Sequence, residues 1–175
     1  ACRGRSGGGC GALKRPGFMP IERAILVVNP GSTSTKLALS RDGTLADSIV
    51  FPHPVEELRS YSRVWEQFSF RLKLCEEWAA EHVVHCDAVV AMGGLLRGVE
   101  GGTYRVNEAM LRDARANLQG EHASNLGCAI AEALRRKFGC PAFVVDPVSV
   151  DEFEPLAYYS GHPSIRRKLR DYLGE

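Results

Sequence analysis

Residues 25–36 have the sequence Ile-Leu-Val-Val-Asn-Pro-Gly-Ser-Thr-Ser-Thr-Lys, an apolar run that breaks into a hydroxyl-rich turn. A short run of Ile, Leu and Val bounded by Asn-Pro-Gly is typical of a buried strand that ends sharply. After the turn, Leu37 and Leu39 alternate with small or polar residues, which is the pattern of a half-buried strand. The stretch therefore predicts a strand, a tight turn and a returning strand, a hairpin rather than a crossover into a helix.

The turn itself offers a ligand backbone N–H groups, four hydroxyls and one ammonium group. This set suits a polyanion such as a phosphate chain. A G-x-x-x-x-G-K-[ST] loop fits less well, because Gly31 has no second glycine before Lys36, and the three spaced glycines of a dinucleotide site are also absent. The alternative is a solvated hairpin loop without a ligand. The apolar strand before the turn and the lysine after it favour phosphate binding.

Composition places the chain among ordinary soluble globular domains. It has 175 residues, 45% hydrophobic and 25% charged, which suits one domain with a sizeable core. The formal net charge is +1, but residues 1–18 hold four basic residues and no acid, so residues 19–175 sum to −3. This balance predicts no nucleic-acid partner.

The six cysteines show neither a Cys-x-x-Cys pair nor the histidine spacing of a zinc site. Reduced thiols and a cytoplasmic location are the simplest interpretation. The apolar runs are shorter than the ~20 residues that span a bilayer, and residues 1–18 lack the apolar stretch of a signal peptide. We therefore expect no membrane partner.

Alternation and helical spacing predict further elements beyond the hairpin. One of them is a helix that begins after Asn107, its cap, and whose inner face should carry Met110, Leu111, Ala114 and Leu118. The expected elements are a third strand at 44–51, an amphipathic helix at 63–82, a strand at 87–92, the helix after Asn107, a helix at 122–138 that Gly139 ends, and a strand at 142–145.

Two of these strands deliver candidate functional residues. The strand at 87–92 leads into Gly93-Gly94, which let a ligand approach the backbone closely, and the strand at 142–145 leads into Asp146-Pro147. The carboxyl ends of parallel strands are where ligands gather in open α/β sheets. The alternatives are a plain turn at the glycines and an unremarkable strand end at the aspartate. His122 alone would be an ordinary polar residue.

Four motifs resemble one family in the same order. The string Asn-Pro-Gly-Ser-Thr-Ser-Thr-Lys at 29–36 resembles the opening motif of butyrate kinases, within the acetate and butyrate kinase family of the actin-like phosphotransferase superfamily. The other three are Gly93-Gly94-Leu95-Leu96 with Glu100-Gly101-Gly102-Thr103-Tyr104, Gln119-Gly120-Glu121-His122-Ala123-Ser124-Asn125, and Val144-Val145-Asp146-Pro147-Val148. One departure is Met92, where family members often carry an arginine; Arg97 lies close in sequence.

The resemblance implies an α/β fold with a ribonuclease H-like mixed sheet, an antiparallel meander followed by parallel strands, flanked by helices, as in the first lobe of an actin-like kinase. Residues 1–22 are expected to be a disordered Gly/Arg-rich extension, with a misassigned start or fragment boundary near Met19. Residues 23–175 would be an N-terminal acetokinase-type lobe. The resemblance stops near Lys168 and covers about half of a family member, so the second, adenosine-binding lobe is expected to be absent.

The resemblance also implies an activity, the transfer of the γ-phosphoryl group of ATP to butyrate with ATP and Mg²⁺ as cofactors. Alternatives are acetate, propionate or a branched acid as acceptor, or an inactive truncated lobe that binds phosphate. A full-length protein would form a homo-oligomer. Phosphate binding falls to Asn29, Gly31, Ser32, Ser34 and Lys36, substrate binding to Gly93, Gly94, His122 and Asn125, and both catalysis and metal binding to Asp146.

Overall fold

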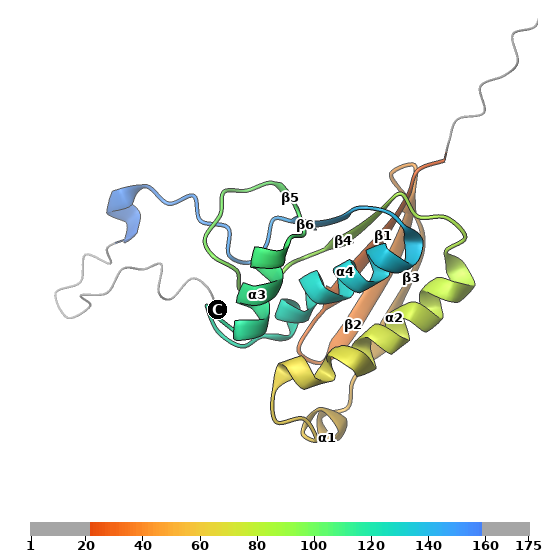
Figure 1. The fold of residues 1–175 in the computed structure, drawn as a ribbon, viewed down its shortest axis with the longest axis horizontal. Helices are drawn as coiled ribbons and strands as arrows, with labels where there is room; N and C mark the ends of the chain where they lie inside the picture. Colours follow the sequence, from red (N-terminus) through yellow and green to blue (C-terminus); the bar gives the residue numbers. More distant parts are fainter. Residues whose placement is uncertain (1–21, 159–175) are drawn as a thin grey trace, which may run out of the picture.

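The computed structural model describes residues 22–158, so residues 1–21 of the expected extension and the segment 159–175 lie outside the described part. Its centre is a six-stranded mixed sheet in the order β3-β2-β1-β4-β6-β5 (Figure 1). The strands are β1 (Ala24–Pro30), β2 (Ser34–Arg41), β3 (Thr44–Pro52), β4 (Ala88–Ala91), β5 (Thr103–Arg105) and β6 (Ala142–Val145). The helices are α1 (Val55–Leu58), α2 (Phe68–His82), α3 (Glu108–Ala116) and α4 (Leu126–Phe138), with 3-10 turns η1 (Val64–Gln67), η2 (Ala123–Asn125) and η3 (Pro155–Tyr158).

The predicted hairpin and meander are confirmed. β1 pairs antiparallel with β2, with Asn29 opposite Lys36, and β2 pairs antiparallel with β3. Asp42 and Gly43 form the second turn with φ of 48° and 78°, the two positive values of a type I′ hairpin. Along β1 alternate residues are buried, as the apolar pattern requires.

The rest of the sheet is mostly parallel. β1 pairs parallel with β4, and β4 with β6, so these three strands end at one edge of the sheet. An antiparallel meander joined to parallel strands in the order 3-2-1-4-6 is the predicted ribonuclease H-like arrangement. β5 was not predicted; it pairs antiparallel with β6 at the far edge of the sheet.

Figure 1 shows α2, α3 and α4 on the same side of the sheet. α4 packs over the central strands, and its residues Leu126, Ile130 and Leu134 are fully buried. Gly139 ends α4 in the left-handed conformation, as predicted. Asn107 caps α3, since its side chain accepts hydrogen bonds from the N–H groups of two first-turn residues. The prediction for Leu118 is wrong, because α3 ends at Ala116 and Leu118 is 49% exposed.

The helix predicted at 63–82 is split into η1 and α2. Its buried side is formed by Arg71, Cys75, Trp78 and Ala79, so one fully buried residue is an arginine. Four cysteines fall within the described residues, and all four are buried free thiols. Within residues 22–158, none of the helices has the length and apolar character needed to cross a membrane.

Candidate active site

The parallel strands bring three of the predicted motifs to one edge of the sheet. β1 ends at the turn that begins with Gly31, β4 ends at Ala91, two residues before Gly93, and β6 ends just before Asp146. The register aligns these ends, because Val28 lies beside Ala91 and Ala91 beside Val144. A ligand at this edge would therefore meet all three segments.

The predicted phosphate ligands lie around the first of these segments. In the pairing of β1 with β2, Leu37 is buried toward the helices, so Lys36 lies on the opposite face with Asn29 and Ser34. Ser32 is exposed at the tip of the turn, and Gly31 donates its N–H to the Ser34 carbonyl at 2.7 Å. Asn29, Ser34 and Lys36 thus lie on the face of the sheet away from α2.

The side of the turn that faces α2 is held by a buried polar cluster that sequence reasoning missed. Arg71 of α2 donates from Nη1 to the carbonyl oxygens of Gly31 and Ser34, at 2.8 and 3.1 Å, and to Thr35 Oγ1 at 3.0 Å. Its Nε and Nη2 both donate to Gln67 Oε1. The sequence did hold one signal for this cluster: Arg71 lies four positions before Cys75, which places a charged residue on the apolar side of the helix.

His53, just after β3, completes this cluster. Thr35 Oγ1 lies 2.8 Å from His53 Nε2. The same hydroxyl oxygen accepts from Arg71 Nη1, so its own proton is available to donate to an unprotonated His53 Nε2. Burial, and then the charge of Arg71, lower the pKa of His53 below its ordinary value of 6.5. Burial and the neighbouring Arg71 charge therefore favour the neutral form of the His53 imidazole in the folded chain.

The lowered pKa of His53 predicts an acid-sensitive fold. Unfolded chains take up a proton on His53 near pH 6.5, and the folded chain resists it, so the free energy of unfolding should fall as the pH drops from 6.5 to the lowered pKa. We expect His53→Gln, which cannot titrate, to lose less stability over that range. Urea denaturation at several pH values from 7.5 to 5 measures both slopes, and equal slopes would contradict the assignment.

The Gly93-Gly94 pair packs too tightly to accept side chains. A Cβ on Gly94 would lie 2.5 Å from both Cα and Oδ1 of Asn125. The Asn125 amide is occupied within the protein, since Oδ1 accepts from the Leu95 N–H at 2.8 Å and Nδ2 donates to Asn117 Oδ1 and the Gly120 carbonyl. Asn125 therefore fixes the backbone beside the glycines, and its direct contact with a substrate stays a prediction.

His122 lies at the start of η2 and is exposed. Its Nδ1 accepts a hydrogen bond from the Ser124 N–H at 3.2 Å, so the proton of the neutral imidazole resides on Nε2. An Nε2–H group can donate to a carboxylate. Arg97, the other candidate for an anion contact, is engaged by Asp113, with Nε 2.7 Å from Oδ2.

Asp146 has φ of 40°, a left-handed backbone that is uncommon outside glycine. Its Oδ1 accepts from the Gly102 N–H at 2.7 Å, and its own N–H donates to the Gly102 carbonyl at 3.0 Å. The side chain is exposed. One carboxylate oxygen is thus anchored to the Gly101-Gly102 segment, and the group remains accessible to a ligand.

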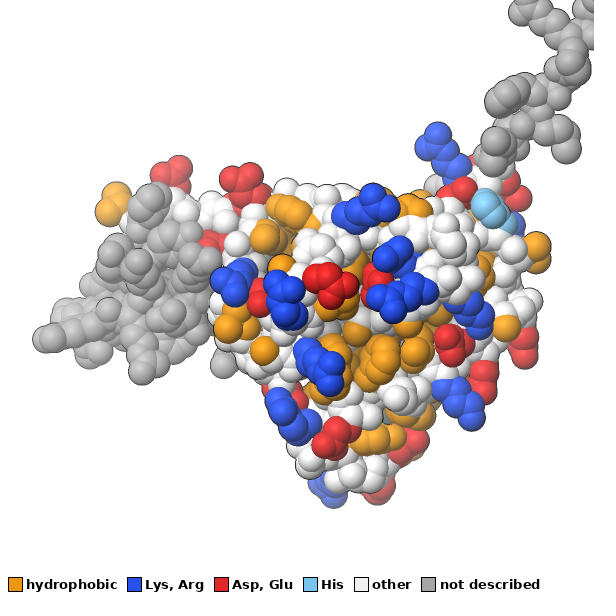
Figure 2. Space-filling view, viewed as in Figure 1, with side chains coloured by type: hydrophobic (Ala, Val, Ile, Leu, Met, Phe, Trp, Pro, Cys, Tyr) orange, Lys and Arg blue, Asp and Glu red, His pale blue; other side chains and the backbone are white. Residues whose placement is uncertain are grey.

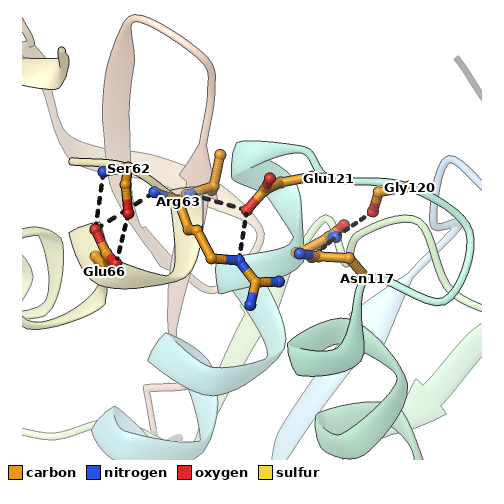
Figure 3. Close-up of polar contacts among 8 residues, drawn as sticks. Ser62, Arg63, Glu66, Asn117, Gly120 and Glu121 are labelled. Atoms are coloured by element: carbon orange, nitrogen blue, oxygen red, sulfur yellow. Dashed lines mark hydrogen bonds and ion pairs between the residues drawn. The ribbon is translucent and has the colours of Figure 1, made fainter.

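The loop with Glu121 and His122 is tied to η1, as Figure 3 shows. Glu121 Oε1 accepts from the Val64 N–H at 3.0 Å and lies 3.8 Å from Arg63 Nε. On the other side of Arg63, Glu66 accepts from the N–H and hydroxyl groups of Ser62. These contacts fix the loop that carries His122 against the segment preceding α2.

A hollow of about 400 Å³ lies elsewhere, among η1, α2, α3 and α4. Its lining includes the apolar Trp65 and Phe68 and three arginines, and the face drawn in Figure 2 mixes basic, acidic and hydrophobic side chains. The predicted site residues do not line it. It is therefore separate from the edge where the three motifs meet.

Comparison with known proteins identifies the relatives of this chain. Butyrate kinase 2 of Clostridium acetobutylicum is 47% identical over 148 residues, which are 82% of this chain and 41% of that protein. The chain is a homologue of the butyrate kinases. The probable butyrate kinase 2 of Caldanaerobacter subterraneus is 44% identical over 151 residues, or 85% of this chain and 43% of that protein. The chain thus spans less than half the length of these two curated relatives.

No protein-family model matches this chain. Among solved structures, it is similar to the acetate kinase of Entamoeba histolytica, with a TM-score of 0.48 and 13% identity over 82% of this chain and 40% of that chain. It is also similar to the Aquifex aeolicus PPX-GPPA enzyme, with a TM-score of 0.43 and 12% identity over 73% of this chain and 54% of that chain. The relationship to kinases therefore rests on the sequence identities.

Proposed function

We propose that this chain forms the phosphate-binding and acid-binding part of a carboxylate kinase that converts butyrate and ATP into butyryl phosphate and ADP. The observation that carries the proposal is the meeting of the Gly31 turn, Gly93-Gly94 and Asp146 at one sheet edge, in a chain 47% identical to a butyrate kinase. A cytoplasmic setting and a homo-oligomeric full-length protein belong to the same proposal.

In this proposal a carboxylate oxygen of the acid attacks the γ-phosphorus, and the bond to the β,γ-bridging oxygen breaks to release ADP. Catalysis of this kind depends on positioning and on stabilising charge on the phosphoryl oxygens. Asn29, Ser32, Ser34 and Lys36 would hold phosphate oxygens from the Gly31 turn. The Nε2–H of His122 would donate to the acid, beside the backbone of Gly93 and Gly94 that Asn125 fixes.

Asp146 fits a role in holding Mg²⁺. In phosphoryl-transfer sites Mg²⁺ is usually bound by one or two carboxylates together with water and substrate phosphates, and Asp146 offers an exposed carboxylate anchored through one oxygen. The ion would neutralise charge on the transferred phosphoryl group. Asp146 itself would orient the acceptor or the hydrated ion at the end of β6.

The acceptor acid is the part of the proposal with close competitors. Acetate, propionate or isobutyrate would use the same chemistry, and one methylene changes the discrimination by only ~1–3 kcal/mol. A second candidate function is phosphate binding without catalysis, for which the Gly31 turn and the polar residues Asn29, Ser34 and Lys36 beside it would suffice.

The test is hydroxylamine trapping of acyl phosphate with C2 to C5 acids, using the product of the native gene after its intact mass has been measured. We expect ATP-dependent hydroxamate with the highest kcat/KM for butyrate. Absence of hydroxamate with every acid would overturn the kinase proposal, and a preference for another acid would reassign the substrate. Hydroxamate formation by the purified 175-residue chain would contradict the alternative of phosphate binding without catalysis.

A further inference from the structure

Arg71 is the largest fully buried side chain in the described structure, at 0% exposure, and it lies directly beneath the Gly31 turn. All its hydrogen-bond partners are neutral oxygen atoms, from the backbone, Thr35 and Gln67. The ion pairs found within residues 22–158 include none to Arg71. A buried guanidinium without a carboxylate is unusual, because an uncompensated buried charge is costly.

The hydrogen bonds of Arg71 also dictate how the turn is oriented. Nη1 and Nη2 draw the carbonyl oxygens of Gly31 and Ser32 inward, at 2.8 and 3.4 Å. The described peptide bonds are trans, so the N–H of each following residue points the opposite way from the carbonyl. The N–H groups of Ser32 and Thr33 therefore point away from Arg71, toward solvent.

Those two N–H groups are available to a ligand. None of the hydrogen bonds within residues 22–158 is donated by the backbone N–H of Ser32 or Thr33. Successive outward N–H groups form a concavity that binds anions. The turn thus has a positive outer surface made of backbone dipoles, and a full positive charge fixed behind it.

We propose that Arg71 is a positioning residue of the phosphate site: it holds the carbonyl oxygens of Gly31, Ser32 and Ser34 inward, so that the Ser32 and Thr33 N–H groups face the phosphate, and its buried charge is balanced by the bound anion. This inference rests on the proposed phosphate-binding role of the turn. Lys36, by contrast, is exposed on the face of the sheet away from α2 and would contact the anion directly.

The test is titration of the full 175-residue chain with inorganic tripolyphosphate. Binding is measured by calorimetry and by the NMR amide signals of Ser32 and Thr33. The variants are Arg71→Met, which removes the charge, Arg71→Lys, which keeps it, and Arg112→Met, a control that removes the same charge from the exposed surface of α3. We expect Arg71→Met to weaken binding by at least about tenfold, Arg71→Lys to recover part of the loss, and Arg112→Met to change affinity by less than about twofold.

The outcomes separate this inference from the proposed function. If tripolyphosphate shifts neither amide in the wild-type chain, the phosphate-binding role of the turn falls, and the inference falls with it. If the wild-type chain binds and Arg71→Met matches Arg112→Met, the turn keeps its role and the inference about Arg71 is overturned.

A measurement on the wild-type chain covers the case in which Arg71→Met does not fold. The Arg71 Nε–H is buried and bonded to Gln67 at 3.1 Å, so it should give a protected NMR signal. We expect this signal to shift with the same saturation curve as the Ser32 and Thr33 amides. A signal that stays constant at saturating tripolyphosphate would overturn the inference.

Discussion

Asp146→Asn is expected to lower the kcat of butyryl phosphate formation by the native gene product about 10²- to 10³-fold, the usual loss when one group that stabilises transition-state charge is removed. Asparagine has the same shape and tolerates the left-handed backbone that Asp146 adopts at φ of 40°. Its amide oxygen can still accept the Gly102 N–H. The substitution therefore removes the negative charge and leaves the local fold in place.

The chain provides a matched control in Asp42. That residue also has a positive φ, 48°, and its Oδ1 also accepts a backbone N–H, from Arg23 at 2.9 Å. It lies in the turn between β2 and β3, away from the edge that carries Asp146. Asp42→Asn should leave kcat within about twofold of the wild type. Steady-state kinetics with varied Mg·ATP measure both variants, and a kcat for Asp146→Asn near that of the wild type would remove the catalytic role.

The elements that were predicted from the sequence depend on local signals. The alternation around Leu37 and Leu39, the Asp42-Gly43 turn and the Asn107 cap each act over a few residues, so the hairpin, the meander and the start of α3 follow from the sequence alone. β5 has no such signal. It contains three residues, and it is a strand only because Thr103–Arg105 pairs with β6, about 40 residues further along the chain.

The same distinction applies to the candidate site. The strand ends before Gly93 and Asp146 could be placed at one edge, because parallel strands share their direction. The parallel pairing of β1 with β4, which adds the Gly31 turn to this edge, was found only in the structure. The cluster behind the turn could not be predicted, since Arg71 reaches Thr35 across 36 residues and His53 reaches it across 18. A buried arginine also contradicts the ordinary expectation that charged side chains face solvent.

Gly93→Ala is expected to destabilise the chain by about 3–5 kcal/mol, a large part of the ~5–15 kcal/mol that stabilises a typical domain. Gly93 has φ of 70°, where an L-residue carries strain, and a Cβ there would lie 2.5 Å from Val144 Cγ1 and 3.1 Å from Pro147 Cβ. Gly43 separates the two effects, because its φ of 78° is similar and a Cβ there would have no atom within 4 Å. Gly43→Ala should therefore cost only the strain, about 1–2 kcal/mol.

Urea denaturation monitored by circular dichroism gives the free energy of unfolding of both variants. The difference between their losses is the cost of close packing after the end of β4. A double-mutant cycle identifies the atom responsible: Val144→Ala removes the methyl group that the new Cβ would meet, so Gly93→Ala should cost less in that background. Equal losses for Gly93→Ala and Gly43→Ala would contradict the packing argument. The predicted difference means that glycine at 93 is required by the contact between β4 and β6, so its presence in the family motif does not by itself demonstrate contact with a substrate.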